Sequence, residues 1–258
     1  KNENLSIHDI AVAAKAAYNE LKKYKEDVQQ QGEYVLEYME RTKTKGIVLT
    51  GRPYHIDPEI NHGLPELIQS YGLAVLSEDS ISHLAQIPRP IRVMDQWMYH
   101  SRLYAAATLV ANRTDLEIIQ LNSFGCGLDA ITMDQVKELL EAKQKIYTAI
   151  KLDEINNLGA ARIRIRSLLA ALKVRKVGTQ NNIEDDPHDH WPTYKKSMRK
   201  THTILAPQMS PVHFQFLQAA IQGSGYQIVI PPLPDKKAVD FGLRFVNNDC
   251  CYPSIIAI

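Results

Sequence analysis

The residue best suited to chemistry in this sequence is Cys126, which is flanked by glycines in the run LNSFGCGLDA of residues 121–130. Residues 116–121 before it predict a buried strand, and residues 129–141 after it have the apolar spacing of a helix. A cysteine at a helix N-terminus sees the positive end of the helix dipole and free backbone N–H groups, which favour the thiolate. Because thiolates bind metals, this turn predicts a metal ligand; the alternative is an ordinary buried cysteine.

Cys250 and Cys251 form a second thiol site, in the run VNNDCCYPS of residues 246–254. Asn and Asp precede the cysteines and Pro follows them, which is also a signal for the start of a helix. The two sites are therefore alike in chemistry. Two such turns at the carboxyl edges of two sheets could face one another across a cleft.

Polar side chains gather in four segments that follow predicted strands or lie between a strand and a helix. These segments are residues 51–63, 77–81, 124–127 and 151–159. In an open α/β sheet, ligands bind beyond the carboxyl ends of the strands. We therefore expect a cofactor or ligand to be bound there by Arg52, His55, Asp79 and Asp153.

The first of these segments allows two interpretations. His55, Asp57, Glu59 and His62 have a spacing compatible with a zinc or iron carboxylate site. The favoured alternative is a rigid, proline-containing loop whose side chains satisfy backbone groups. Arg52 could bind a phosphate or carboxylate. No glycine-rich fingerprint of the dinucleotide or P-loop type follows any predicted strand, which argues against NAD or ATP binding by these residues.

Strands and helices alternate along most of the sequence. The predicted strands are 47–50, 74–76, 117–121 and 146–150, and the predicted helices are 64–71, 94–112, 134–143 and 159–173. A helical arm precedes them at residues 8–41, with an interruption expected at Gly32. Such alternation implies βαβ units. The predicted fold class is therefore α/β, with a Rossmann-like (flavodoxin-like) parallel sheet domain, a helical N-terminal arm and a partial second α/β unit.

The expected domain organisation has four parts. They are a helical arm (1–45), a Rossmann-like domain (46–173), a connector (174–200) and the truncated start of a second α/β domain (201–258). The connector is polar, and its histidines and acids favour a solvated linker over a metal site. Because the sequence begins without Met and stops in an apolar run, we expect it to be a piece of a longer protein. A homodimer could then close the unfinished sheet edge.

The composition is that of an ordinary globular protein, with 45% apolar and 23% charged residues in a chain of 258. Its formal net charge of +1 gives no reason to expect nucleic acid as a partner. No apolar run of 18 residues occurs, so no membrane partner is expected. The three cysteines show no disulfide spacing, which fits a reducing, cytoplasmic environment.

The longest motifs resemble those of one family. They are residues 51–63, 95–97, 121–129, 157–164 and 246–253. They are similar to the multidomain activators of 2-hydroxyglutaryl-CoA dehydratase, also called CoA-substrate-specific enzyme activases, and the resemblance covers most of residues 8–258. In that family an ATPase module precedes a portion similar to 2-hydroxyacyl-CoA dehydratase subunits, whose Rossmann-like domains hold an iron–sulfur cluster. This sequence resembles the second portion only.

The resemblance implies that Cys126 and Cys251 are cluster ligands, whereas Cys250 stands where a small apolar residue is expected. It also implies an iron–sulfur cluster, of the 4Fe–4S kind, that the full-length protein completes with further thiolates and that the isolated fragment lacks. ATP would bind only on the separate module. The implied partners are the protein's own ATPase and dehydratase-like modules and an acyl-CoA dehydratase or other electron acceptor.

Two functions follow from the resemblance. The first is ATP-driven, low-potential electron transfer in a dehydratase-type system of anaerobic metabolism, carried out by a full-length ATP-dependent reductase and not by the isolated fragment. The alternative is a non-catalytic scaffold or interaction domain that keeps the dehydratase-like fold.

Overall fold

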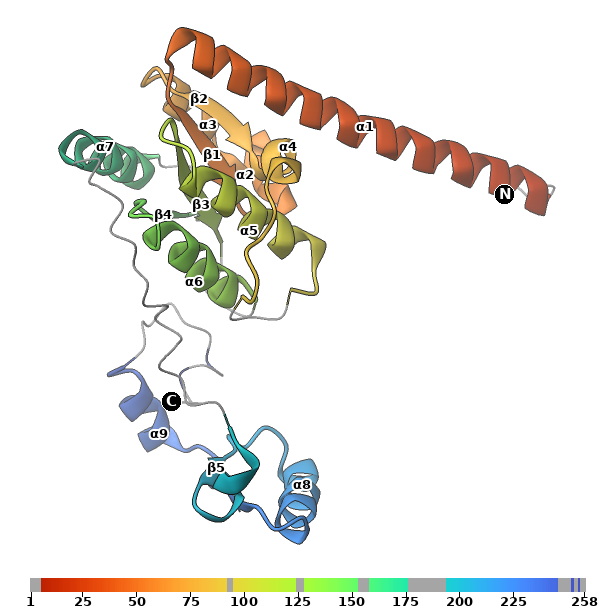
Figure 1. Ribbon diagram of the computed structural model, residues 1–258, viewed down its shortest axis with the longest axis vertical. Coiled ribbons are helices and arrows are strands. Elements are labelled where there is room, and N and C mark those ends of the chain that lie inside the picture. The colour runs from red at the N-terminus through yellow and green to blue at the C-terminus, as the bar shows by residue number, and fades with distance from the viewer. Residues whose placement is uncertain are drawn as a thin grey trace. The chain divides into compact units, whose positions relative to one another are not determined.

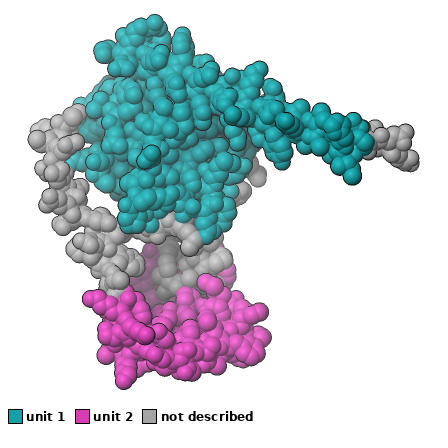
Figure 2. All heavy atoms as spheres, turned by 45° about the vertical axis from the view of Figure 1, so that its right-hand side comes forward, with its two compact units in different colours: residues 1–124, 128–180 teal, residues 125–127, 181–258 magenta. Residues whose placement is uncertain are grey.

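The structure, a computed structural model, describes residues 6–91, 95–123, 128–152, 158–175 and 194–245, together with Tyr252 and Ile255. The chain divides into two compact units (Figure 2). The described part of the first unit runs from Ser6 to Arg175, and that of the second begins at Tyr194.

The first unit begins with one long helix, α1 (Ile7–Thr42), whose N-terminal half projects beyond the sheet (Figure 1). Ser6 and Asp9 start it with a capping box, in which the Ser6 hydroxyl accepts the Asp9 N–H and the Asp9 carboxylate accepts the Ser6 N–H, each at 3.1 Å. The predicted interruption at Gly32 is wrong. A Cβ at that position would lie 2.2 Å from the carbonyl oxygen of Ser80, so the glycine lets the helix approach α4 (Glu78–Ile81) closely.

Four parallel strands form the central sheet: β1 (Gly46–Thr50), β2 (Ala74–Ser77), β3 (Leu116–Asn122) and β4 (Thr148–Lys151). Their order is β2-β1-β3-β4, and Gly46 lies opposite both Ala74 and Leu116. The predicted Rossmann-like parallel sheet is confirmed. Successive strands are added on opposite sides of β1, so the topological switch point lies between β1 and β3.

Both faces of the sheet are covered by helices. On one face lie the C-terminal part of α1, α5 (Met98–Ala111) and α6 (Leu128–Glu141), and on the other lie α3 (Leu64–Gln69) and α7 (Gly159–Val174). Because side chains of a strand alternate between faces, Val48 packs in the first core whereas Ile47 and Leu49 pack in the second. The strands are mostly apolar because the sheet is buried on both sides, although β3 also buries Glu117, Gln120 and Asn122.

Shorter elements complete the first unit. They are η1 (Pro53–Ile56), α2 (Pro58–Asn61) and η2 (Ser82–Leu84). The first two follow β1 and shape the loop in which the sequence places most candidate site residues.

The second unit contains a βαβ arrangement. Its strands β5 (Thr203–Leu205) and β6 (Gln227–Val229) are parallel, with Ile204 opposite Ile228, and α8 (Pro211–Gly223) connects them. Two further elements, η3 (Lys196–Lys200) and α9 (Lys236–Gly242), flank it. Among the residues that the structure describes, no helix has the length and apolar character needed to cross a membrane.

Candidate functional site

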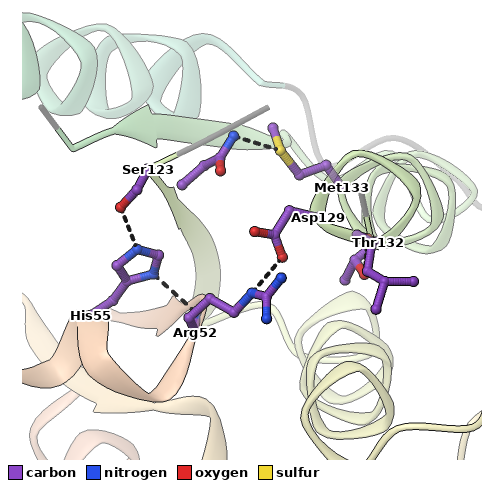
Figure 3. Close-up of polar contacts among 8 residues, drawn as sticks. Arg52, His55, Ser123, Asp129, Thr132 and Met133 are labelled. Atoms are coloured by element: carbon purple, nitrogen blue, oxygen red, sulfur yellow. Dashed lines mark hydrogen bonds and ion pairs between the residues drawn. The ribbon is translucent and has the colours of Figure 1, made fainter. Parts of the chain in front are cut away.

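The candidate site lies where β1 and β3 end, at the switch point of the sheet, and His55 is its most constrained member. His55 is 4% exposed, and its ring Nδ1 accepts the backbone N–H of Arg52 at 3.0 Å (Figure 3). The proton of the neutral ring is therefore on Nε2, which donates to Ser123 Oγ at 3.0 Å. His55 in this tautomer fixes Ser123 and does not deprotonate it.

Local sequence explains the position of the His55 ring. Gly51 precedes the turn with φ +156°, and a Cβ there would lie 2.4 Å from His55 Nδ1. Only glycine leaves room for this contact. Burial lowers the pKa of His55, the nearby Asp129 carboxylate opposes that shift, and the Arg52 guanidinium adds to it. The ring is thus neutral at pH 7.

Arg52, in the same loop as His55, forms an ion pair with the first turn of α6. Its Nε donates to Asp129 Oδ1 at 2.7 Å, and Asp129 is the second residue of α6 (Figure 3). Ser123 and Asp129 stand on either side of residues 124–127 in the sequence. The loop after β1 therefore holds the chain on both sides of the segment that contains Cys126.

A second ion pair lies beside this loop, at the end of β2. The Glu78 side chain is buried, and its Oε1 accepts a hydrogen bond from Nη2 of Arg102, on α5, at 3.1 Å. Burial raises the pKa of Glu78 to about 7, the neighbouring Asp79 carboxylate adds to the shift, and Arg102 opposes it. Glu78 therefore changes charge near neutral pH.

Several buried polar atoms at this edge have no hydrogen-bond partner among the described residues. They are Thr50 Oγ1, His100 Nδ1, Arg102 Nε and Asn122 Oδ1. Thr50, Arg52, His55 and Glu78 line a cavity of about 20 Å³, enough for one water molecule. Such unsatisfied groups indicate a site that water or a ligand completes.

The structure places two of the predicted ligand-binding residues together and one apart. Arg52 and His55 share the loop after β1, as described above. Asp79 instead accepts the Ser77 hydroxyl at 2.6 Å and lines a groove of about 530 Å³ between α1, α5 and the chain after α4. The predicted residues Asp153, Cys126 and Cys251, and also Cys250, lie outside the described residues. Their roles stay predictions.

The contacts of the first loop favour its structural interpretation over a metal site. His55 uses both ring nitrogens within the protein, and Asp57 Oδ1 accepts the Glu59 N–H at 2.9 Å to cap α2. Within the described ranges, no group of three or more His, Cys, Asp or Glu side chains could hold a metal ion.

Four residues of the site were not predicted as such: Ser123, Asp129, Glu78 and Arg102. The first two lie in the same motif as Cys126, and Glu78 precedes Asp79, so proximity in the sequence gave a signal for them. Arg102 carries no such signal, because its partner Glu78 lies 24 positions earlier and meets it only through the packing of α5.

The sheet order and the polar edge define a Rossmann-like protein with a candidate site at its switch point. A family model described as CoA enzyme activase uncharacterised domain (DUF2229) matches residues 1–81, which include Arg52, His55 and Glu78. The match covers less than a third of the chain, and it supports the predicted resemblance to the activator family of CoA-substrate enzymes. Searches of curated proteins and of solved structures returned no match.

Proposed function

We propose that this protein is a module of an activator that transfers low-potential electrons to a CoA-substrate enzyme, with an iron–sulfur cluster bound in part by Cys126 and Cys251. The observation that supports this proposal best is the double anchoring around Cys126. His55 binds Ser123 before it and Arg52 binds Asp129 after it, at 3.0 and 2.7 Å. A cofactor ligand requires such a preorganised surrounding.

The charges and the helix dipole at the carboxyl edge of the sheet also favour the thiolate form of Cys126. Helix α6 begins at Leu128, so its positive end lies close to Cys126 in the sequence. The Asp129 carboxylate would oppose thiolate formation, but Arg52 compensates its charge. The neutral His55 adds no charge of its own.

The described residues do not by themselves supply a metal site, so the proposal depends on the cysteines and on the family resemblance. A bound cluster would supply one-electron transfer at low potential. The residues on β1 and β3 would hold its ligand in place and keep the surrounding chain ordered. The proposed partners are an ATPase module of the same protein, where ATP is hydrolysed, and an acyl-CoA dehydratase as the electron acceptor.

Anaerobic purification of the complete gene product, with iron and sulfide analysis and an electron paramagnetic resonance spectrum, tests this function. Cys126→Ala and Cys251→Ala should each lower bound iron and abolish reduction of the acceptor, while ATP hydrolysis continues. Cys250→Ala is the matched control and should leave iron content unchanged. Unchanged iron in both of the first two variants would contradict the proposal.

The alternative function is a scaffold or interaction domain without its own redox chemistry. The observation that favours it is the exposed N-terminal half of α1, where residues 7–27 are all exposed. Absence of iron and sulfide from anaerobically purified wild-type protein would favour this alternative.

A further inference from the structure

The exposed half of α1 carries an apolar stripe with alternating spacings of three and four residues. The stripe consists of Ile7, Ile10, Ala14, Ala17, Leu21, Tyr24 and Val28. This is the heptad repeat by which helices pair. The large side chains of the stripe are open to solvent, with 87% of Ile7, 48% of Leu21 and 59% of Tyr24 exposed.

The opposite face of the same helix is mostly polar, although Val12 and Ala16 also lie on it. It carries Lys15, Asn19, Lys22, Lys23 and Glu26, and Lys22 Nζ lies 3.7 Å from Glu26 Oε1. The helix is therefore amphipathic over residues 7–27, all of which are exposed in the part of the chain that the structure describes. Most helices of this kind gain their stability by burying the apolar face against another element.

The uncovered part of the stripe ends where the sheet domain begins to cover the helix. Tyr24 and Val28 line the 530 Å³ groove, whose other wall includes Met98 and Ala105 of α5. Further along, Gly32, Leu36 and Met39 are buried. The stripe thus continues into an interface within the molecule, and residues 7–24 are the part that remains for a partner.

We propose that a second copy of this chain covers the stripe, with its α1 antiparallel to the first. In the register that aligns the two stripes, Ile7 lies opposite Tyr24 of the second copy. Likewise Ile10 lies opposite Leu21, and Ala14 opposite Ala17. These residue pairs span residues 7–24, which is the uncovered part of the stripe.

The residues that flank the stripe fit this register. Tyr18 lies opposite Ala11 of the second copy and Glu20 lies opposite Ala13, so each large side chain meets a small one and like charges do not meet. The alanines at the centre allow the helices to approach closely. Antiparallel pairing also places the two sheet domains at opposite ends, whereas a parallel pair would bring both domains to the same end of the helices.

Sedimentation equilibrium over a range of protein concentrations tests the pairing. The wild-type mass should rise with concentration to that of two copies. Leu21→Glu places a carboxylate in the stripe and should reduce the mass to that of one copy, with helix content measured by circular dichroism as a check on folding. Asn19→Glu adds the same carboxylate to the polar face and should leave the dimer intact. A wild-type protein that stays monomeric, or a Leu21→Glu variant that stays dimeric, would overturn the proposal.

Cross-linking tests the orientation. In a background with Cys126, Cys250 and Cys251 replaced by alanine, a mixture of Ile10→Cys and Leu21→Cys proteins should form a mixed disulfide dimer, and neither variant alone should do so. Dimers of Ile10→Cys alone would show parallel pairing and overturn the register. The inference uses none of the cysteines and is independent of the proposed electron transfer, because mass is measured without a cluster.

Discussion

Arg52 Nε donates to Asp129 Oδ1 at 2.7 Å, and this ion pair joins two residues that are 77 positions apart. Both side chains are partly shielded from solvent, with 35% and 20% of their surfaces exposed. Together with the bond from His55 to Ser123, it ties the loop after β1 to the end of β3 and to the start of α6. The switch point of the sheet is thus held by side chains and not by backbone pairing alone.

Removal of the Asp129 charge should therefore destabilise the first unit. In Asp129→Asn the partly buried Arg52 guanidinium loses its carboxylate, and we expect the free energy of unfolding in urea to fall by about 1 kcal/mol, a value reduced by the remaining solvent exposure. Asp134→Asn, an exposed change on the same helix, should alter it by less than about 0.5 kcal/mol. Equal effects of the two variants would argue against a structural role for the ion pair.

His55 should make stability depend on pH below neutrality. Since burial lowers the pKa of His55 in the folded state, the unfolded chain binds a proton at higher pH than the folded protein does. The stabilisation by neutral His55 is present above about pH 6.5 and is lost as the pH falls. The difference in unfolding free energy between wild type and His55→Gln should therefore shrink from pH 7.5 to about pH 5. A gap between wild type and His55→Gln that stays constant with pH would refute this prediction.

Glu78 should make the protein less stable as the pH rises, which is the opposite of the effect expected for His55. Its pKa is raised by burial to about 7, so the folded protein binds a proton that the unfolded chain releases near pH 4.5. The neutral carboxyl stabilises the fold below that pH, and the contribution is lost as the pH rises through about 7. In urea unfolding from about pH 4.5 to pH 8, wild type should lose up to about 3 kcal/mol relative to Glu78→Gln. If the difference between the two proteins does not change with pH, Glu78 is not the titrating group.

The sequence predicted the sheet because its strands are short apolar runs separated by amphipathic helices, a pattern that depends on local spacing. For a similar reason it placed Arg52 and His55 in a polar loop directly after a strand, and their role in binding a ligand stays a prediction. The strand order and the pairing of Glu78 with Arg102 could not be predicted, because they depend on how distant helices pack on the sheet. The tautomer of His55 likewise follows only from its two partners in space.

Gly32 shows why one local rule failed. A glycine inside a helix costs about 1 kcal/mol relative to alanine, which favours an interruption when only the local sequence is considered. In the folded protein the same residue is where α1 and α4 come closest, so tertiary packing decides the outcome.

The packing at Gly32 predicts that alanine at this position destabilises the protein, whereas helix propensity alone predicts that alanine stabilises it. Alanine at an exposed helical position would stabilise the helix, but a Cβ here would lie 2.2 Å from the Ser80 carbonyl oxygen and 2.8 Å from its carbon, which are backbone atoms that cannot move aside alone. We expect Gly32→Ala to lower the free energy of unfolding by about 1–3 kcal/mol because α1 must shift from α4. Gln31→Ala, at the adjacent exposed position, should change it by less than about 0.5 kcal/mol. A Gly32→Ala protein as stable as wild type would show that α1 is not closely packed against Ser80.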